Sequence, residues 1–341
     1  MLIKINDFFC QHGIHSETKV IISIDLDNTL VIRNKGSNYV NPELKKIIIT
    51  LIKDKRIIFV PNTGRELVGF RSFEKKFFRF RNGILCSGSL IINNDEIFIN
   101  QNGKIDPGVQ EIFISAVKND ILPFIDFSYI GGRLIVCNKR GLQYKALFYS
   151  QNPTGWFAGK FPPYQLVDSL KTNHLNSVLR LEFPVLKSYK NHSALFARLL
   201  EKSEDNIKQL EKLLNINGQK ILHRYSVKNK IFFNNRFNKN EITFGRFEKL
   251  PSFTNKGMGL RIWLEKNKIP YNDFVIMHIG DHDAGLINDT IIKKGIRKVL
   301  IIMVGEKCKL NNPSVNLYLR GDTEKNLLLF FRELCKKLKI N

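Results

Sequence analysis

The sequence lacks an apolar stretch approaching the roughly 20 residues that span a bilayer, so neither a membrane-spanning helix nor a membrane partner is expected. Its 5 cysteines are odd in number, widely scattered and without a C-x-x-C pair. This pattern disfavours a disulfide framework and a zinc site. The N-terminal residues lack the basic start and long apolar centre of a secretory signal. Together these absences predict a cytoplasmic protein with reduced thiols.

Acidic residues are scarce beside basic ones: 31 Asp and Glu against 54 Lys and Arg give a formal net charge of +23. Such a balance suggests a nucleic-acid or anionic-membrane partner. The basic residues are spread along the whole chain, however, and no nucleic-acid-binding motif accompanies them. A lysine-rich surface is the favoured interpretation, and nucleic acid is a disfavoured partner. A positive field also suits a phosphorylated substrate.

At 341 residues the chain exceeds what one hydrophobic core usually holds, which predicts two domains. Residues 19–24, 42–53 and 56–60 form a strand–helix–strand pattern, and this rhythm returns after residue 256. There the expected helices are 258–267, 286–294 and 325–339, and the expected strands are 274–279 and 298–304. The stretch between holds short, antiparallel-looking strand candidates, such as residues 220–226, mixed with helices, such as residues 193–214. We therefore predict an α/β fold, a Rossmann-like parallel-sheet core with an inserted α+β cap domain. The predicted boundaries are 1–103 and 251–341 for the core and 104–250 for the cap.

Two carboxylates, Asp25 and Asp27, follow directly on an apolar run that begins at Ile21. Alternate residues of a strand share a face, so burying both carboxylates inside one strand would be costly. At the carboxyl end of a strand they diverge at a crevice, where open α/β sheets bind ligands. Mg²⁺ selects hard oxygen ligands and would offset the crowded negative charge. The pattern predicts a magnesium site, with an ordinary Asp-Asn turn as the alternative.

Three later segments supply matching chemistry in order along the chain. The run ending at Val60 leads to Thr63-Gly64-Arg65, Lys256-Gly257 opens a helical pattern, and another apolar run ends at Gly280-Asp281. A carboxylate nucleophile, a hydroxyl, a cation and a second carboxylate on separate elements are the groups that phosphoryl transfer uses.

These four segments resemble the four motifs of the haloacid dehalogenase (HAD) phosphohydrolase superfamily. Their spacing is similar to that of the type IIB capped subgroup, in which a large cap is inserted between the second and third motifs. This subgroup includes Cof-like and sucrose-phosphate phosphatases. Residues 81–92 also resemble its strand and glycine turn before the cap.

The resemblance implies a role for each motif residue. Asp25 would be the nucleophile that forms an aspartyl-phosphate, and Asp27 the general acid and then base, with its backbone carbonyl on the metal. Asp25 and Asp281 would hold Mg²⁺ through their carboxylates. The phosphoryl group would be bound by Thr63, Gly64 and Lys256.

The fourth motif departs from the family pattern. The usual second acid stands four residues after the first, where this chain has Gly285. Asp283 is the accessory candidate to replace it, and Arg65 is an accessory candidate that extends the second motif. Mg²⁺ keeps several waters, so one missing outer carboxylate would weaken binding without abolishing it.

The sequence thus predicts a Mg²⁺-dependent phosphomonoester hydrolase for a small phosphorylated metabolite, with a sugar phosphate as the preferred class. A phosphomutase of the same architecture would use the same aspartate but return the phosphate to its substrate. A binding or regulatory protein on a weakened HAD site is another alternative, since the missing acid would allow it. A nucleic-acid 3′-phosphatase fits the charge, but a large cap disfavours a polymeric substrate.

Overall fold

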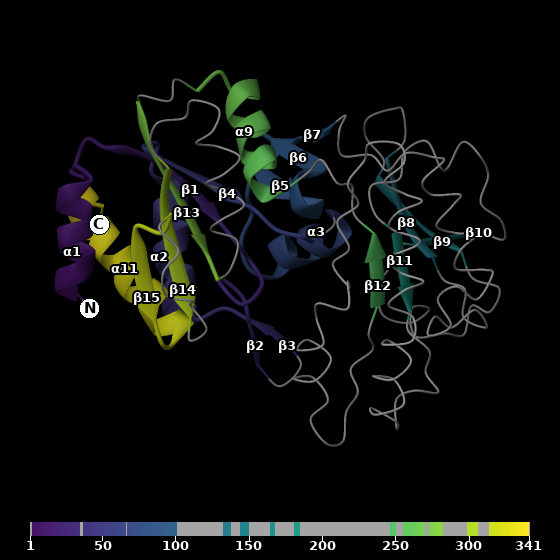
Figure 1. Ribbon diagram of the computed structural model, residues 1–341, viewed down its shortest axis with the longest axis horizontal. Coiled ribbons are helices and arrows are strands. Elements are labelled where there is room, and N and C mark those ends of the chain that lie inside the picture. The colour runs from purple at the N-terminus through teal and green to yellow at the C-terminus, as the bar shows by residue number, and fades with distance from the viewer. Residues whose placement is uncertain are drawn as a thin grey trace. The chain divides into compact units, whose positions relative to one another are not determined.

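The computed structural model describes residues 2–34, 37–65, 67–100, 132–137, 144–149, 164–167, 181–184, 246–249, 255–269, 273–281, 299–305 and 314–340. The chain divides into two compact units, one of Met1–Asn100 with Thr254–Asn341 and one of Gln101–Phe253 (Figure 1). The first unit contains all the motif residues that the structure describes.

A five-stranded sheet forms the centre of the first unit, with strand order β15-β14-β13-β1-β4. All of its neighbouring strands pair in parallel, which confirms the predicted Rossmann-like core. The strands are β1 (Lys19–Ile24), β4 (Ile57–Pro61), β13 (Phe274–Gly280), β14 (Val299–Gly305) and β15 (Leu317–Arg320). The sequence had predicted all of them except β15.

Burial on both faces explains why these strands are nearly continuous apolar runs. Every residue of β14 is buried, and in β1 only the first residue is exposed. Because β1 pairs with β13 on one side and with β4 on the other, Ile24 lies opposite both Ile279 and Pro61. The carboxyl ends of these three strands therefore share one edge, at the topological switch point where α/β sheets bind ligands.

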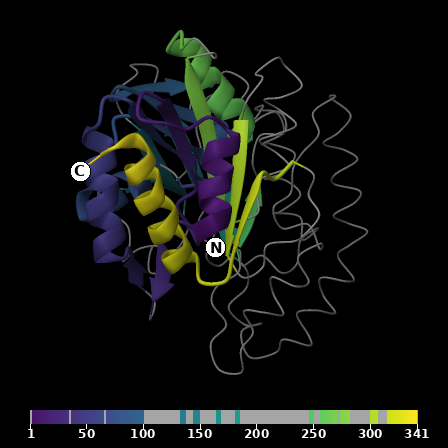
Figure 2. The same cartoon turned by 90° about the vertical axis from the view of Figure 1, so that its left-hand side faces the viewer.

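Three helices cover one face of the sheet: α1 (Leu2–Gln11), α2 (Pro42–Lys53) and α11 (Thr323–Leu338). Figures 1 and 2 both show α1 and α11 side by side, and the rings of Phe9 and Phe330 lie 5.2 Å apart. Phe59 of β4 meets Phe331 at 6.0 Å. The predicted helix 42–53 is confirmed, with Asn41 as its N-cap. The sequence did not predict α1.

Helix α9 (Lys256–Lys266) packs with an antiparallel sheet of β5 (Gly83–Leu85), β6 (Leu90–Asn93) and β7 (Glu96–Ile99). Leu260 and Trp263 of α9 are fully or almost fully buried in a cluster with Ile21 of β1 and Ile276 of β13. This cluster also contains Val60, which neighbours Phe59 in β4 and so points to the opposite face of the sheet. Helix α9 therefore lies on the face that α11 does not cover.

The contact between α9 and the turn after β5 has no room for side chains. Gly88 adopts a φ of +98°, and a Cβ built on it would lie 2.3 Å from the carbonyl oxygen of Asn255. A Cβ on Gly259 would lie 2.4 Å from Cγ2 of Ile84 and 2.8 Å from Cα of Gly88. The two glycines let the backbones touch, which fixes the first turn of α9.

The remaining described elements are helix α3 (Leu67–Lys76), a hairpin of β2 (Ile32–Asn34) and β3 (Ser37–Tyr39), and strands of the second unit. In the second unit β8 (Gly132–Cys137), β9 (Tyr144–Tyr149) and β10 (Tyr164–Val167) form one sheet, and β11 (Leu181–Pro184) pairs with β12 (Arg246–Lys249). The antiparallel expectation holds for β8 with β9 and for β11 with β12 but is wrong for β9 with β10, which pair in parallel.

Several predicted elements, namely the helices at 193–214 and 286–294 and the strand at 220–226, lie outside the described residues. Within the described part of the chain, no helix is both long enough and apolar enough to cross a bilayer. Cys10, Cys86 and Cys335 are free thiols.

An ion pair at the amino end of β4 should make the folding stability depend on pH. Arg56 donates to Asp54 through Nε at 2.9 Å and Nη2 at 2.6 Å, and through Nη1 to the carbonyl oxygen of Leu338 at 2.8 Å. The Arg56 guanidinium lowers the pKa of Asp54 below its ordinary 3.8, against the raising effect of burial. A carboxyl group with a lowered folded-state pKa contributes stability above its unfolded pKa and loses it as the pH falls through the folded value.

We therefore expect Asp54→Asn to be less stable than the wild type at neutral pH, with the gap closing as the pH falls below 3.8. Urea unfolding across a pH series measures this gap. A gap that stays constant with pH would contradict the role given to Arg56.

The glycine contact under α9 gives a prediction about packing. Gly259→Ala should destabilise the protein by about 1–3 kcal/mol, because its new Cβ meets backbone and a buried side chain. Gly83→Ala is the matched control, since its Cβ would meet Phe70 at an ordinary 3.5 Å. Urea unfolding that ranked the two variants equally would refute the close contact.

Candidate active site

Asp25 lies directly after β1, at the shared carboxyl edge of the strands. Its backbone N–H donates to the carbonyl oxygen of Ile279 at 2.9 Å, which continues the β1–β13 pairing to the end of the strand. Only 4% of the residue is exposed. Its Oδ1 accepts from the backbone N–H of Leu26 at 2.8 Å. A nearly buried carboxylate at this edge needs a positive partner.

Lys256 is that partner. Its Nζ lies 2.8 Å from Oδ1 of Asp25, and the two side chains are 5% and 6% exposed. Lys256 is the first residue of α9, whose N-cap Asn255 accepts from the backbone N–H of Met258 at 2.8 Å. The structure therefore brings two of the predicted site residues, 231 positions apart by their numbers (256 − 25), into direct contact.

Thr63 follows β4 and is fully buried. The backbone N–H of Asn62 donates to the carbonyl oxygen of Ile24 at 2.8 Å, so this segment continues alongside β1. The backbone of Thr63 is held by Ile84 and Ser87, each through one hydrogen bond, at 2.8 and 3.1 Å. Its Oγ1 accepts from the backbone N–H of Arg65 at 3.1 Å. The hydroxyl keeps its own proton to donate.

Arg65 binds Asp27 with both arms of its guanidinium. Nε donates to Oδ2 at 3.0 Å and Nη2 to Oδ1 at 2.6 Å, the bidentate geometry that gives strong charge-assisted hydrogen bonds. The guanidinium also lies 5.4 Å from the ring centre of Phe73. The Asp27 side chain is 41% exposed, so it lies at the rim of the site. The sequence had given Arg65 only an accessory place.

Asn28 explains how the chain can turn away immediately after Asp27. It adopts a φ of +60°, a left-handed conformation that asparagine tolerates better than most residues. Its backbone N–H donates to the carbonyl oxygen of Val31 at 2.9 Å. The Asp-Asn turn that the sequence offered as the alternative is thus present directly after the two carboxylates.

Asp281 follows β13, the neighbour of β1, and is half-buried. A Cβ built on Gly280 before it would lie at an ordinary contact distance of 3.8 Å from Cβ of Asp25, so the ends of β13 and β1 lie side by side. Asp25 and Asp281 are thus carboxylates at the ends of adjacent parallel strands. The accessory candidate Asp283 lies outside the described residues.

This donor set fits Mg²⁺ in one of its common binding modes. Among the described residues no group of three or more His, Cys, Asp or Glu side chains is arranged to hold a metal ion. An all-protein metal cage is therefore not what this part of the chain offers. Mg²⁺ is usually bound by one or two carboxylates with waters and substrate phosphate, which Asp25 and Asp281 can satisfy.

The buried polar residues Ser23, Asn62 and His278 were missed from the sequence. Their exposures are 0%, 0% and 1%, and they lie on or beside the strands that carry the motifs. Spacing was the available signal: Ser23 precedes Asp25 by two residues and His278 precedes Gly280 by two. Residues two apart in a strand share a face, so a polar residue there points to the same side as the site.

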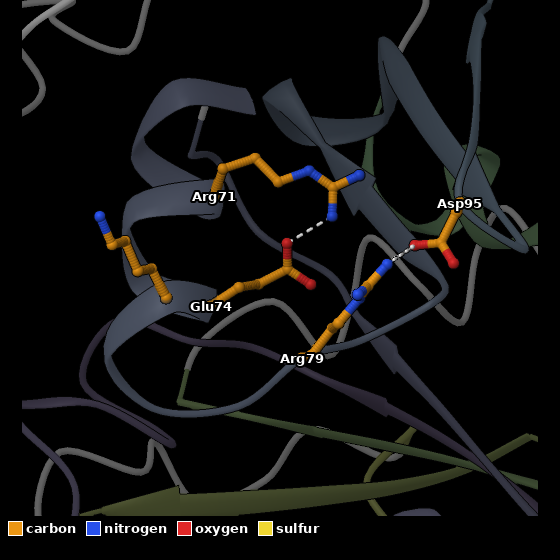
Figure 3. A pocket seen from close by; sticks show the side chains of 5 residues that line it. Arg71, Glu74, Arg79 and Asp95 are labelled. Carbon is orange, nitrogen blue, oxygen red and sulfur yellow. Dashed lines mark hydrogen bonds and ion pairs between the residues drawn. The ribbon is translucent and has the colours of Figure 1, made fainter.

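A separate cavity of about 420 Å³ lies at the other end of α3 and contains none of the predicted site residues (Figure 3). In it Arg71 donates to the buried Glu74 at 2.5 Å, and Glu74 also accepts from the backbone N–H of Phe80 at 2.8 Å. Arg79 lies 3.8 Å from Asp95. These charges are mainly paired with one another, so they close the loop after α3 rather than form a phosphate site.

The family model for haloacid dehalogenase-like hydrolases matches residues 22–286. The chain therefore belongs to the haloacid dehalogenase-like hydrolases, and the resemblance drawn from the motifs is confirmed.

Solved structures share the fold at low sequence identity. TM0651 from Thermotoga maritima is 15% identical; the match covers 93% of this chain and 97% of TM0651, with a TM-score of 0.58. BT1666 from Bacteroides thetaiotaomicron, a phosphatase of the haloalkanoate (HAD) superfamily, is 14% identical; the match covers 96% of this chain and 97% of BT1666, with a TM-score of 0.55. Trehalose-6-phosphate phosphatase from Aspergillus fumigatus is also 14% identical; the match covers 98% of this chain and 97% of that phosphatase, with a TM-score of 0.51. No curated protein matches the sequence significantly.

The buried pair of Asp25 and Lys256 gives a prediction that does not depend on activity. Lys256→Met should destabilise the protein by about 3–5 kcal/mol, because it leaves the Asp25 carboxylate buried without its cation. Adding Asp25→Asn should restore most of this loss, since the amide carries no charge. Urea unfolding of the two single variants and the double variant measures the coupling.

The exposed pair of Arg261 and Glu265 in the same helix is the matched control. It has a similar separation of 2.6 Å, but its side chains are 28% and 45% exposed. Arg261→Met should cost less than about 1 kcal/mol. Equal losses for the buried and exposed pairs would contradict the assignment.

Proposed function

We propose that this protein is a Mg²⁺-dependent phosphomonoester hydrolase that forms an aspartyl-phosphate on Asp25. The observation that carries the proposal is the buried contact between Asp25 and Lys256 at the carboxyl edge of the parallel sheet. Family membership adds that a hydrolase is expected. The substrate class is a small phosphorylated metabolite, and a sugar phosphate is the preferred candidate.

Lys256 prepares Asp25 for a phosphate. A buried carboxylate alone would repel an incoming dianion, and the ammonium group 2.8 Å away neutralises that charge. The carboxylate attacks phosphorus, the bond to the leaving oxygen breaks, and the phosphoryl group is carried on Asp25. Thr63 and the backbone N–H of Gly64 donate to the phosphoryl oxygens. Bound Mg²⁺, held by Asp25 and Asp281, supplies further neutralisation of phosphoryl charge.

Asp27 moves the proton in both steps. It gives a proton to the leaving alcohol and then takes one from the water that attacks phosphorus, while the bond from phosphorus to Asp25 breaks and inorganic phosphate leaves. Its bidentate pair with Arg65 holds the Asp27 carboxylate at the rim of the site, and the exposure of Asp27 gives an alcohol or a water access to it.

The second unit, Gln101–Phe253, is proposed to act as the cap that selects the substrate. A cap that closes over the site would exclude bulk water while the aspartyl-phosphate exists. This assignment favours a small substrate over a nucleic acid. The free thiols of Cys10, Cys86 and Cys335 support the cytoplasmic setting that we propose.

A panel of phosphorylated metabolites, assayed for released phosphate with and without Mg²⁺, tests the function. We expect Mg²⁺-dependent turnover that falls at least about 10³-fold in Asp25→Asn, because the amide cannot act as the nucleophile. Asp54→Asn at the amino end of β4 is the control and should retain wild-type turnover under conditions where it is folded.

The alternative functions predict different results in the same assay. A phosphomutase would convert its substrate while releasing almost no inorganic phosphate. A binding or regulatory protein would bind substrate with negligible turnover at saturating Mg²⁺. Turnover by Asp25→Asn at the wild-type rate would refute the proposal that Asp25 forms an aspartyl-phosphate.

A further inference from the structure

Three buried polar side chains lie in a row behind the pair of Asp25 and Lys256. Asn62 directly follows β4, Ser23 belongs to β1 and His278 to β13, so the row crosses three adjacent segments of the sheet. All three residues are at most 1% exposed. We call them the buried polar chain.

Hydrogen bonds connect the buried polar chain to α9. Nδ2 of Asn62 donates to the backbone carbonyl oxygen of Lys256 at 3.0 Å and to Oγ of Ser23 at 3.2 Å. Oγ of Ser23 lies 3.0 Å from Nδ1 of His278. A carbonyl oxygen can only accept, so this contact fixes which end of the Asn62 amide faces Lys256.

We propose that the buried polar chain positions Lys256 against Asp25, an inference that rests on the proposed function. Lys256 is the first residue of α9, and its carbonyl oxygen is the point that Asn62 holds. Fixing that backbone atom limits where Nζ can lie. Asn62 therefore acts on the reaction through Lys256 and is a positioning residue.

The chain ties together the segments that the reaction needs. Asn62 precedes Thr63, and Ser23 lies two residues before Asp25. At the far end, Nε2 of His278 lies 3.1 Å from where a Cβ of Gly280 would be, so the imidazole abuts the backbone just before Asp281. A displacement of α9 would thus be resisted by contacts with all three strands that carry site residues.

Energetics favour a positioning role over simple core filling. Burying a polar group destabilises the fold unless the group is fully hydrogen-bonded. Apolar residues of similar size would fill the same space with a smaller loss of folding free energy. Among the described residues Oδ1 of Asn62 has no hydrogen-bond partner, although it is buried. A buried polar atom without a partner lowers the stability of the fold. Such losses are expected at positions where the function of a site, rather than stability, determines the residue.

The hydroxyl of Ser23 links the two ends of the buried polar chain. It accepts from Nδ2 of Asn62 and lies 3.0 Å from Nδ1 of His278, where the tautomer of the imidazole decides which group donates. Asn62 donates at both of its contacts, to the carbonyl oxygen of Lys256 and to the Ser23 hydroxyl.

The test compares Asn62→Ala with Asn326→Ala. Asn326 is 3% exposed, and its Nδ2 donates to two carbonyl oxygens, those of Leu319 and Arg320, at 3.1 and 2.7 Å. Both variants lose the two hydrogen bonds of a buried amide, but Asn326 lies in α11 and is not among the site residues. We expect kcat to fall by up to about 10²-fold in Asn62→Ala with KM little changed, because the misplaced ammonium acts mainly in the transition state. Asn326→Ala should lower the unfolding midpoint while leaving kcat at the wild-type value.

Crystal structures of the same variants give the second readout. We expect the distance from Nζ of Lys256 to Oδ1 of Asp25 to lengthen beyond hydrogen-bond range in Asn62→Ala, from 2.8 Å in the wild type. If Asn62→Ala fails to fold, Ser23→Ala removes the middle of the chain and should change kcat and the distance in the same direction.

The two readouts separate the proposals. If the wild type hydrolyses no phosphomonoester, the proposed function fails, and the distance in the variant structures still decides the positioning role. A distance that stays at 2.8 Å, or a kcat in Asn62→Ala equal to that of Asn326→Ala, overturns the positioning role while the phosphatase proposal stands.

Discussion

The rest of the site depends on one buried ion pair, that of Lys256 with Asp25. Taking both charges out of water costs several kcal/mol per ion, and only a close, well-held contact compensates. The contact needs the first turn of α9 to lie against the carboxyl end of β1. The Asn255 cap and the side-chain-free contact of Gly88 with Gly259 make that placement possible. The position of the backbone, rather than additional charged residues, thus keeps the ammonium of Lys256 beside the carboxylate of Asp25.

The geometry divides the site into a buried rear and an exposed rim. Asp25, Lys256 and Thr63 lie at the rear, where a low dielectric strengthens each electrostatic contact. Asp27 lies at the rim, paired with Arg65 and open to solvent. This division suits a reaction in which one carboxylate must bond to phosphorus while its neighbour exchanges protons with an alcohol and with water. The left-handed Asn28 turns the chain away immediately after Asp27.

Family membership and the low identity to solved structures carry different information. The family match and the parallel sheet define a hydrolase fold, whereas neighbours of 14–15% identity share architecture alone. What this chain does must therefore be read from its own side chains. The buried polar chain and the Arg65–Asp27 pair are features of those side chains.

The sequence by itself determined four strands of the five-stranded central sheet, the main core helices and the edge at which the motifs meet. The strand 19–24 and the helix 42–53 were predictable because an apolar run and an amphipathic pattern that begins with proline are local signals. It missed α1, β15 and the parallel pairing of β9 with β10, because partners far along the chain decide those. Only the tertiary structure showed that Lys256 touches Asp25, that Arg65 holds Asp27, and that Asn62, Ser23 and His278 form one chain. Spacing along a strand indicates which face a residue shares, but whether two groups on different elements lie within hydrogen-bond distance depends on how those elements pack.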